Sequence, residues 1–476
     1  MSSTDAKDLS LLIYSTLNNF GFKKENVCFR SKYLMSYKAL KHFYNIVGSA
    51  GEGVPLSHSD VDCMIVLDDI ICLDQCDTVE NLTILETDNS NTAPGYTKVV
   101  LKNKLRGSEF EILLHLSTYA SATTPDGQPY VSSTIFRGTY NYFKICTIPL
   151  LRLQYEITIN GPAETYKLSG RSANFDKDFV LSLLFYGSEH LSKWANRTRY
   201  YTWPSSECVR EISEMEGYLV PVGDKQSAHQ DLEWRICYTT AEKELIASLN
   251  DIQIKVYVLL KMVAKSVLKS VCKALTSYVV KNVVFWVMEG THQQSLSPDL
   301  IVNLIQKSLY FMKYCLENNH FPNYIIPERN LLRGAVNSRE KQNVINFLSD
   351  CLREGGTVLL RVPKLYQCVS YSTTYPENVI KYGKWRDEAE KQKLLLDFRL
   401  AEICDHNFLF NTTTCKSMNE IQNLFLNRMN DAKTVEHLVK LLVLVMPDFI
   451  PLLLSGKTPQ ELHEVLAKRL EMISLL

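Results

Sequence analysis

The stretch from Gly48 to Asp62 reads GSAGEGVPLSHSDVD and decides the expected fold. A glycine-serine turn leads to Asp60 and Asp62, and the second acid lies inside the β-branched run VDCMIVL, which predicts a strand. Residues i and i+2 of a strand project from the same face, so the two carboxylates lie side by side. Unless they share a proton, a cation relieves their repulsion, and carboxylate oxygens suit Mg²⁺ or Mn²⁺ better than zinc.

The turn before the acids favours a phosphate ligand. Gly48 allows close backbone approach, and Ser49 adds a hydroxyl beside exposed N–H groups, a geometry that accepts phosphate oxygens. A phosphate site next to a cation site indicates a nucleotide. The other interpretation is a surface turn that runs into a strand whose acids are merely solvated, because two acids at this spacing are common.

Outward from this stretch, the sequence predicts a mixed α/β fold. Residues 10–46 carry apolar side chains at helical spacing, interrupted at Gly21, which predicts a short helix and a longer one that ends near Gly48. The runs TKVVLKNKL and FEILLHL predict further strands. Beyond about Thr240, runs such as KELIASLNDIQIKVYVLLKMVAKSVLKSVCKAL and LIVNLIQKSLYFMKYCLENN predict a helical lobe. The last 140 or so residues show helical patterns at both ends and an irregular middle around SYSTTYPENVIKYGKW.

Composition limits the functional classes. The chain has 476 residues, enough for two or three lobes, and 52 basic residues balance 52 acidic ones, so any nucleic-acid surface must be a local patch. Thirteen scattered cysteines and the lack of an apolar segment after MSSTDAKD predict a reduced, cytoplasmic protein. The most apolar run, KLLVLVMPDFIPLLL, is broken by two prolines and an aspartate, so no membrane span is expected.

Several motifs in order give a specific resemblance. The glycine-serine turn with paired acids resembles the nucleotidyltransferase pattern, in particular that of the Mab-21 family, which includes cyclic GMP-AMP synthase and its animal receptor relatives. The further matching segments are INGPAETYKLSG with FDKDFVLSLLF, LEWRICYTTAEKELI, LLKMVAK, LTSYVVKNVVFWVME and NYIIPERNLL. The resemblance covers about residues 10–334. It implies a bilobal nucleotidyltransferase fold, with a mixed-sheet catalytic lobe, a helical second lobe and a mostly helical C-terminal extension.

The resemblance also assigns roles to residues. It implies that three acids hold two Mg²⁺ or Mn²⁺ ions: Asp60, Asp62 and Asp178. Residues alone leave the third acid open, since Glu109, Glu111 and Asp176 also lie in strand-like contexts. Asp178 is preferred because its apolar surroundings make an unpaired carboxylate costly. The implied nucleotide-binding residues are Gly48, Ser49, Arg235, Thr239, Glu242, Lys261, Ser277 and Tyr278. Each also has a structural interpretation, as a solvated lysine, a core aromatic residue or an ion-pair partner.

Two departures from the family pattern affect the expected ligands. The sequence runs through LIASLNDIQIKVY without the histidine-cysteine zinc insertion of the mammalian DNA sensor, so no zinc is expected, and Cys72 and Cys76 lack ligand partners. This favours double-stranded RNA over double-stranded DNA as the activating ligand. Cys237 stands where the resembling segment usually has serine, which could alter the base preference among ATP, GTP and other nucleoside triphosphates.

Two basic runs are candidates for a nucleic-acid surface. The preferred run holds Lys23, Lys24, Arg30, Lys32, Lys38 and Lys41 against a single acid. The second places lysines every four residues from Lys261 to Lys273, which predicts one stripe along a helix or an ordinary solvated face. Phosphate contacts of this kind weaken with salt.

We therefore expect an N-terminal helical spine (1–46), a catalytic lobe (47–240), a helical lobe (241–334) and a C-terminal helical extension of unknown role (335–476). The leading functional hypothesis is an innate immune sensor that makes a cyclic dinucleotide second messenger. A variant of this hypothesis keeps the enzyme class but gives linear oligonucleotides as the product. The alternative from another class is a catalytically inactive Mab-21-like binding or developmental protein.

Overall fold

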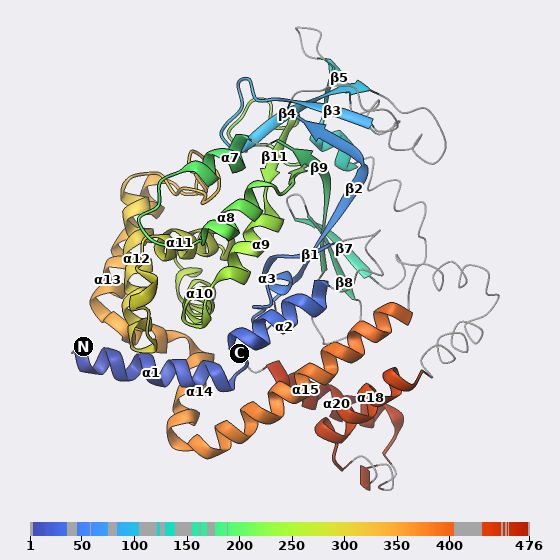
Figure 1. Cartoon of the computed structure of the whole chain (residues 1–476), viewed down its shortest axis with the longest axis vertical. Coiled ribbons are helices and arrows are strands. Elements are labelled where there is room, and N and C mark those ends of the chain that lie inside the picture. The colour runs from blue at the N-terminus through green and yellow to red at the C-terminus, as the bar shows by residue number, and fades with distance from the viewer. Residues whose placement is uncertain are drawn as a thin grey trace, which may run out of the picture.

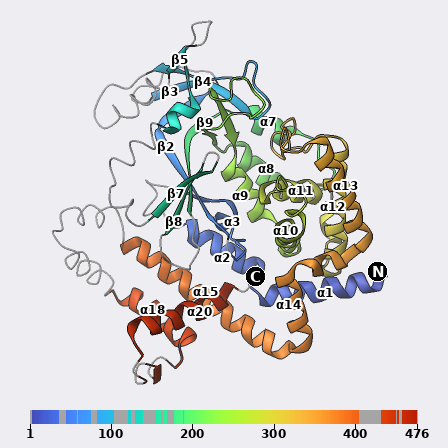
Figure 2. The same ribbon diagram turned by 180° about the vertical axis from the view of Figure 1, so that it is seen from behind.

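The computed structural model describes residues 3–35, 45–57, 59–74, 83–103, 121–123, 129–138, 155–160, 163–168, 177–187, 189–403, 431–448, 451–452, 455 and 457–474. Figure 1 shows a sheet on one side, a mass of helices beside it, and a group of C-terminal helices along the lower edge; Figure 2 shows the same arrangement from behind. The mixed sheet followed by helices confirms the predicted fold class.

The N-terminal helices are α1 (Ser3–Asn19) and α2 (Lys24–Met35). Gly21 separates them with a φ of +88°, a conformation that glycine adopts most readily. The predicted helix up to Gly48 is wrong at its end, because residues 45–47 form the strand β1 (Asn45–Val47), which pairs with β2. The single turn α3 (Gly48–Gly51) follows. The pairing with β2 overrides the helical periodicity that the sequence shows there.

The described strands form an 11-stranded mixed sheet. After β1 they are β2 (Val61–Leu73), β3 (Thr83–Asp88), β4 (Tyr96–Asn103), β5 (Ser121–Thr123), β6 (Pro129–Val131), β7 (Tyr155–Asn160), β8 (Ala163–Leu168), β9 (Lys177–Tyr186), β10 (Gly217–Val220) and β11 (Glu233–Cys237). The strand predicted at VDCMIVL is confirmed as β2, and TKVVLKNKL falls mainly on β4. The segment FEILLHL lies outside the described residues.

Strands β2 and β9 run parallel at the centre, and the register pairs Val61 with Lys177 and Asp62 with Asp178. The pairings β2–β3, β3–β4, β4–β11, β11–β10 and β10–β9 close a ring with β2–β9. Near the amino ends of the central pair, β1 pairs with β2 and β8 pairs with β9, both antiparallel. The amino ends of β2 and β9 therefore carry their acids to one edge of the sheet, beside the turn that follows β1.

The helical lobe is built from α7 (Glu189–Asn196), α8 (Ser206–Ser213), α9 (Thr239–Ser248), α10 (Asp251–Val263), α11 (Ser277–Glu289) and α12 (Ile301–Glu317). Asn250 caps α10 with a capping box, and Thr276 caps α11 through the amide of Val279. Helix α10 is buried along almost its whole length and is the centre of the lobe. The lysine stripe predicted on one helix is wrong, because α10 ends at Val263 and a π-helical turn, Ala264–Leu268, follows.

The C-terminal helices are α13 (Ser338–Glu354), α14 (Pro363–Thr374), α15 (Pro376–Ile403), α18 (Ala432–Val445) and α20 (Pro459–Glu471). Short 3₁₀ segments are Gln293–Ser295, Pro298–Leu300, Gly355–Arg361 and Met472–Ser474. The irregular middle predicted around residues 370–385 is wrong, since α14 and α15 cover it except for Tyr375.

Two hydrophobic cores divide the described residues. The first core contains buried side chains from Ile13 to Val379 and is shared by the sheet and the helical lobe. Helices α13 and α14 pack as part of this core. A second, smaller core joins α15 to α18 and α20, and includes Ala389, Leu441 and Val445. Among the described helices, none combines the length and the apolar character that crossing a bilayer requires.

Candidate functional site

Asp62 and Asp178 are neighbours on the two central strands. They are directly paired in the parallel register of β2 and β9, and Val47 of β1 pairs with Asp62 on its other side. The Thr165 hydroxyl donates a 2.6 Å hydrogen bond to Asp178 Oδ1. Asp60 lies just before β2 and is exposed. The structure thus brings Asp62 and Asp178 together from segments more than a hundred residues apart, while Glu109, Glu111 and Asp176 lie outside the described residues.

The glycine-serine turn is fitted against Asp62. Gly48 has a φ of +61°, and a Cβ atom there would lie 2.1 Å from Asp62 Oδ2, so only glycine leaves room for this carboxylate. The Ser49 hydroxyl accepts a 2.7 Å hydrogen bond from Lys261 Nζ, which donates another of the same length to the Val54 carbonyl. Ser49, Lys261 and Asp62 therefore converge on one edge of the sheet.

The electrostatics of this edge disfavour an unpaired negative charge on Asp62. Burial raises the pKa of Asp62 to about 6, and the charges of Asp178, Asp60 and Glu52 add to the rise, against a smaller opposing effect of Lys281. Burial also lowers the pKa of Lys261 to about 8. The carboxylate oxygens of Asp60, Asp62 and Asp178 are of the donor type that suits Mg²⁺ or Mn²⁺. Within the described part of the chain, however, no three His, Cys, Asp or Glu residues lie close enough together to hold a metal ion.

Behind the edge lies a buried polar cluster centred on Lys281 of α11. Its ammonium group forms ion pairs with Glu52 (2.9 Å) and Glu242 (2.6 Å), and the three side chains are almost completely buried. The Tyr257 hydroxyl donates to Glu52 Oε2 at 2.8 Å, and the Tyr278 hydroxyl to Glu242 Oε1 at 2.9 Å. The cluster links the turn after β1 to α9, α10 and α11.

Sequence reasoning found two members of this cluster, Glu242 and Tyr278, but missed Glu52, Tyr257, Lys281 and Asn323. Asn323 donates a 3.0 Å hydrogen bond to the Tyr278 hydroxyl and is buried. A signal for Lys281 was present, because it is a single charge in the apolar run SYVVKNVVFW, and a lysine is almost never fully buried unless it is paired.

The remaining predicted nucleotide residues lie around this cluster. Arg235 of β11 pairs in register with Tyr96 of β4, and its Nε atom has no hydrogen-bond partner among the described residues. Thr239 begins α9, with its hydroxyl 3.9 Å from Met64 Sδ. Ser277 begins α11 and is exposed. The structure thus groups Glu242 with Tyr278 and Ser49 with Lys261.

Two cysteines singled out in the sequence are also placed. Cys237 is half-buried at the end of β11, and Cys72 is fully buried on β2, where burial raises the pKa of its thiol. Cys76 lies outside the described residues.

The predicted nucleic-acid surface is only partly exposed. Arg30 is buried, donates to the carbonyls of Gly21 (2.6 Å) and Gly53 (2.9 Å), and pairs with Glu390 at 3.1 Å, so it is a structural residue and not part of an open surface. Lys23 pairs with Asp387 at 3.1 Å.

The rest of this basic run is more open. Lys24 is half-buried, and Lys32 is exposed. Lys38 and Lys41 lie outside the described residues.

Comparison with known proteins identifies both lobes. The Mab-21 protein nucleotidyltransferase domain matches residues 79–248, and the Mab-21 protein HhH/H2TH-like domain matches residues 253–352. The first match begins after the turn and strand that carry Gly48, Ser49, Asp60 and Asp62. A search of curated proteins found no match. The nucleotidyltransferase domain supports a transferase activity. The chain therefore contains the nucleotidyltransferase domain of Mab-21 proteins, followed by their helical C-terminal domain.

Proposed function

We propose that the protein is a nucleotidyltransferase that makes a cyclic dinucleotide from nucleoside triphosphates such as ATP and GTP. The observation that carries the proposal is the convergence of three features at one sheet edge. These are the paired acids Asp62 and Asp178, the close turn at Gly48, and the Lys261–Ser49 hydrogen bond. Such an edge offers carboxylates for cations beside donors for phosphate oxygens, which is what transfer of a nucleotidyl group requires.

Each group has a role in this proposal. Mg²⁺ or Mn²⁺ bound by Asp62 and Asp178, with Asp60 completing the set, would supply Lewis-acid stabilisation of the phosphate charge. Ser49 and the Gly48 backbone orient the triphosphate, and Lys261 supplies a positive charge close to it. Tyr278, held by Glu242 and Asn323, offers an aromatic face for a base, and Arg235 offers donors for a base edge.

We further propose that double-stranded RNA activates the enzyme in the cytoplasm as part of innate immune signalling, in preference to double-stranded DNA. The support is the basic run of α2, in which Lys32 is exposed and Lys24 half-buried. Lys32 also lines a hollow of about 420 Å³ between α2, α9 and α10, where Lys243 adds a second amine beside the carboxylates of Glu52 and Glu244. An A-form duplex would be held there through its phosphates and would dissociate as salt increases.

The test is a product assay. Purified protein is incubated with the four ribonucleoside triphosphates and Mg²⁺ or Mn²⁺, without nucleic acid or with double-stranded RNA or DNA, and products are identified by mass spectrometry. We expect a cyclic dinucleotide only with RNA, lost in Asp60→Asn/Asp62→Asn and in Asp178→Asn. Asp350→Asn, an exposed acid on α13, is the matched control and should retain activity. Linear oligonucleotides would refute cyclisation, and stimulation by DNA alone would refute the RNA assignment.

A second candidate is a binding protein that retains the fold without turnover. The observation that favours it is that, in the described residues, no three acid, histidine or cysteine side chains are gathered to hold a metal. Equilibrium binding separates the candidates. A nucleotide that binds in the presence of EDTA with unchanged affinity, and that is recovered unmodified under every condition of the product assay, would support the binding protein and refute the enzyme.

A further inference from the structure

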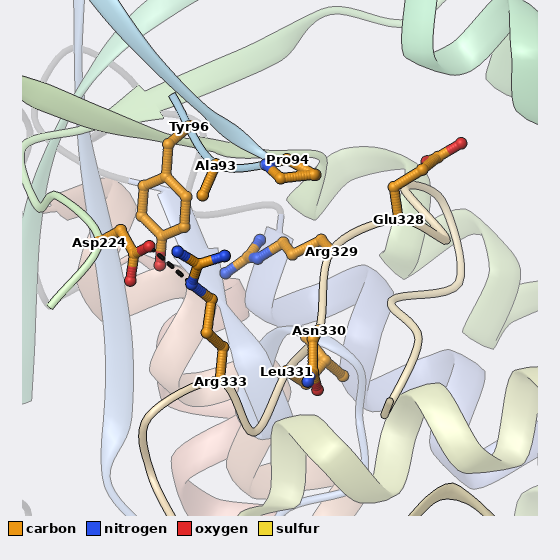
Figure 3. A pocket seen from close by; sticks show the side chains of 9 residues that line it. All are labelled: Ala93, Pro94, Tyr96, Asp224, Glu328, Arg329, Asn330, Leu331 and Arg333. Atoms are coloured by element: carbon orange, nitrogen blue, oxygen red, sulfur yellow. Dashed lines mark ion pairs between the residues drawn. The ribbon is translucent and has the colours of Figure 1, made fainter. Parts of the chain in front are cut away.

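A small cavity of about 90 Å³ lies between the β3–β4 turn, the β10–β11 connection and the segment 328–333. Its lining contains none of the candidate-site acids Asp60, Asp62 and Asp178. Two arginines of that segment line it, Arg329 and Arg333, and Tyr96 forms another wall. Figure 3 shows the two guanidinium groups pointing toward one another across the cavity. Like charges that face one another repel, so such a pair indicates a counter-ion between them.

The charge of Arg329 is not balanced by an ion pair within the described residues. Its side chain is nine-tenths buried, yet no described carboxylate forms an ion pair with it. Its guanidinium lies 5.6 Å from the centre of the Tyr96 ring, and Nη1 makes one long hydrogen bond, 3.4 Å, to the Ile236 carbonyl. A buried cation with a single weak acceptor among the described residues is costly to maintain. An anion in the cavity would remove that cost.

Arg333 is held in place by a carboxylate of the cavity lining. Its Nε atom pairs with Asp224 Oδ2 at 2.9 Å, and Asp224 is almost completely buried and also accepts the Gln226 amide at 3.1 Å. This carboxylate therefore serves to orient Arg333, and the guanidinium of Arg333 lies beside that of Arg329 (Figure 3). Glu328, the other acid of the lining, is exposed, and Figure 3 shows its carboxylate turned away from the arginines.

The backbone makes room for this arrangement. Gly95 has a φ of +82°, and a Cβ atom there would lie 2.5 Å from Arg329 Cδ, so the arginine stem passes directly over this glycine. The Ile236 amide donates to the Gly95 carbonyl at 2.9 Å, which fixes the turn to β11. The site is thus built from three separate segments, and close packing on Gly95 positions Arg329.

We propose that this cavity binds a phosphate-sized oxyanion, held between the guanidinium groups of Arg329 and Arg333. Planar guanidinium groups offer paired donors that match two oxygens of a phosphate. The volume accommodates one such group and not a nucleotide base. The oxyanion can be free inorganic phosphate or the terminal phosphate of a larger molecule, and the two sources share this chemistry.

The test is isothermal titration of the full chain with inorganic phosphate at constant ionic strength, in buffer without divalent cations. We expect saturable binding that weakens at least tenfold in Arg329→Gln, weakens less in Arg329→Lys, and is unchanged in Arg353→Gln, an exposed arginine on α13. Glycerol 3-phosphate is the second probe. Binding of both probes indicates that a terminal phosphate is accepted, and binding of phosphate alone indicates the free ion. Both results support the site.

A second variant separates this cavity from the sheet edge where Ser49 lies. Lys261→Gln should leave the Arg329-dependent phosphate binding intact. Binding that is lost in Lys261→Gln and retained in Arg329→Gln would overturn the proposal, as would a wild-type chain that binds neither probe.

Thermal unfolding in phosphate-free buffer adds an independent readout. Arg329→Gln should unfold at the same or a higher temperature than the wild type, because it removes an unbalanced buried charge. A clear fall in the unfolding temperature, together with unchanged phosphate binding, would show that Arg329 is only a packing residue.

Discussion

Removing Lys281 should destabilise the protein strongly, because it leaves two buried carboxylates without a counter-ion. Lys281→Met retains most of the side-chain volume but breaks ion pairs of 2.9 Å to Glu52 and 2.6 Å to Glu242, whose side chains are about 4% and 6% exposed. Breaking a buried pair from one side costs about 3–5 kcal/mol. Such a loss lowers the folded-to-unfolded ratio by about 100-fold to several thousand-fold.

The assay is guanidinium chloride unfolding followed by tryptophan fluorescence, since Trp286 lies on the same helix as Lys281. Lys313→Met is the matched control, because Lys313 forms a helical ion pair with Glu317 at 3.6 Å on a more exposed face and should lose less than about 1 kcal/mol. The triple variant Glu52→Gln/Glu242→Gln/Lys281→Met should recover much of the loss, since no charge stays buried. A Lys281→Met variant within 1 kcal/mol of the wild type would refute the reasoning.

Three further predictions follow from the same contacts. Gly48→Ala should lower nucleotidyl transfer by about 100-fold in the product assay, because its Cβ would displace the Asp62 carboxylate. Gly138→Ala should have no effect, since no atom of the described residues lies within 4 Å of its Cβ, and equal activities of the two variants would contradict the role of the turn. Arg30→Gln should lower the free energy of unfolding by about 3 kcal/mol, because it weakens the contacts to the Gly21 and Gly53 carbonyls and to Glu390. The control Arg353→Gln, at an exposed arginine, should change the free energy of unfolding little. A similar small change in both variants would show that the buried guanidinium is dispensable. Burial lowers the pKa of Lys243 to about 8, so the folded state disfavours the charged amine at neutral pH and regains stability as the pH rises from 8 toward the usual lysine value. Lys243→Met should therefore be more stable than the wild type by about 1 kcal/mol near pH 7, after allowance for solvent screening. This advantage should disappear above about pH 10 in urea unfolding, and an advantage that persists there would show that packing, not charge, is responsible.

The sequence predicted those parts of the fold whose pattern is local. The β-branched run at Asp62 is a strand, and the long apolar periodicity beyond Thr240 is a helical lobe, because both patterns report which face of an element is buried. The local pattern gave a wrong prediction at residues 45–47, where a helix was expected and a strand paired with β2 is found. It failed again around Tyr375, where α14 and α15 replaced an expected irregular segment.

The candidate site shows the same division. Gly48, Ser49, Asp60 and Asp62 could be singled out from one short stretch, and the choice of Asp178 needed a family resemblance, since residues alone left other acids open. The roles of these residues in catalysis remain predictions. The structure adds that Asp178 is the register partner of Asp62.

The sequence by itself determined the kinds of element and the residue types available for chemistry, because these follow from periodicity, turn composition and side-chain donors. Only the tertiary structure decided which groups meet. It placed Lys281 between Glu52 and Glu242, buried Arg30 against Glu390, and set Arg329 opposite Arg333. The physical reason is that pairing between distant segments depends on strand register and on the burial of charge, and neither quantity is encoded in the spacing of neighbouring residues.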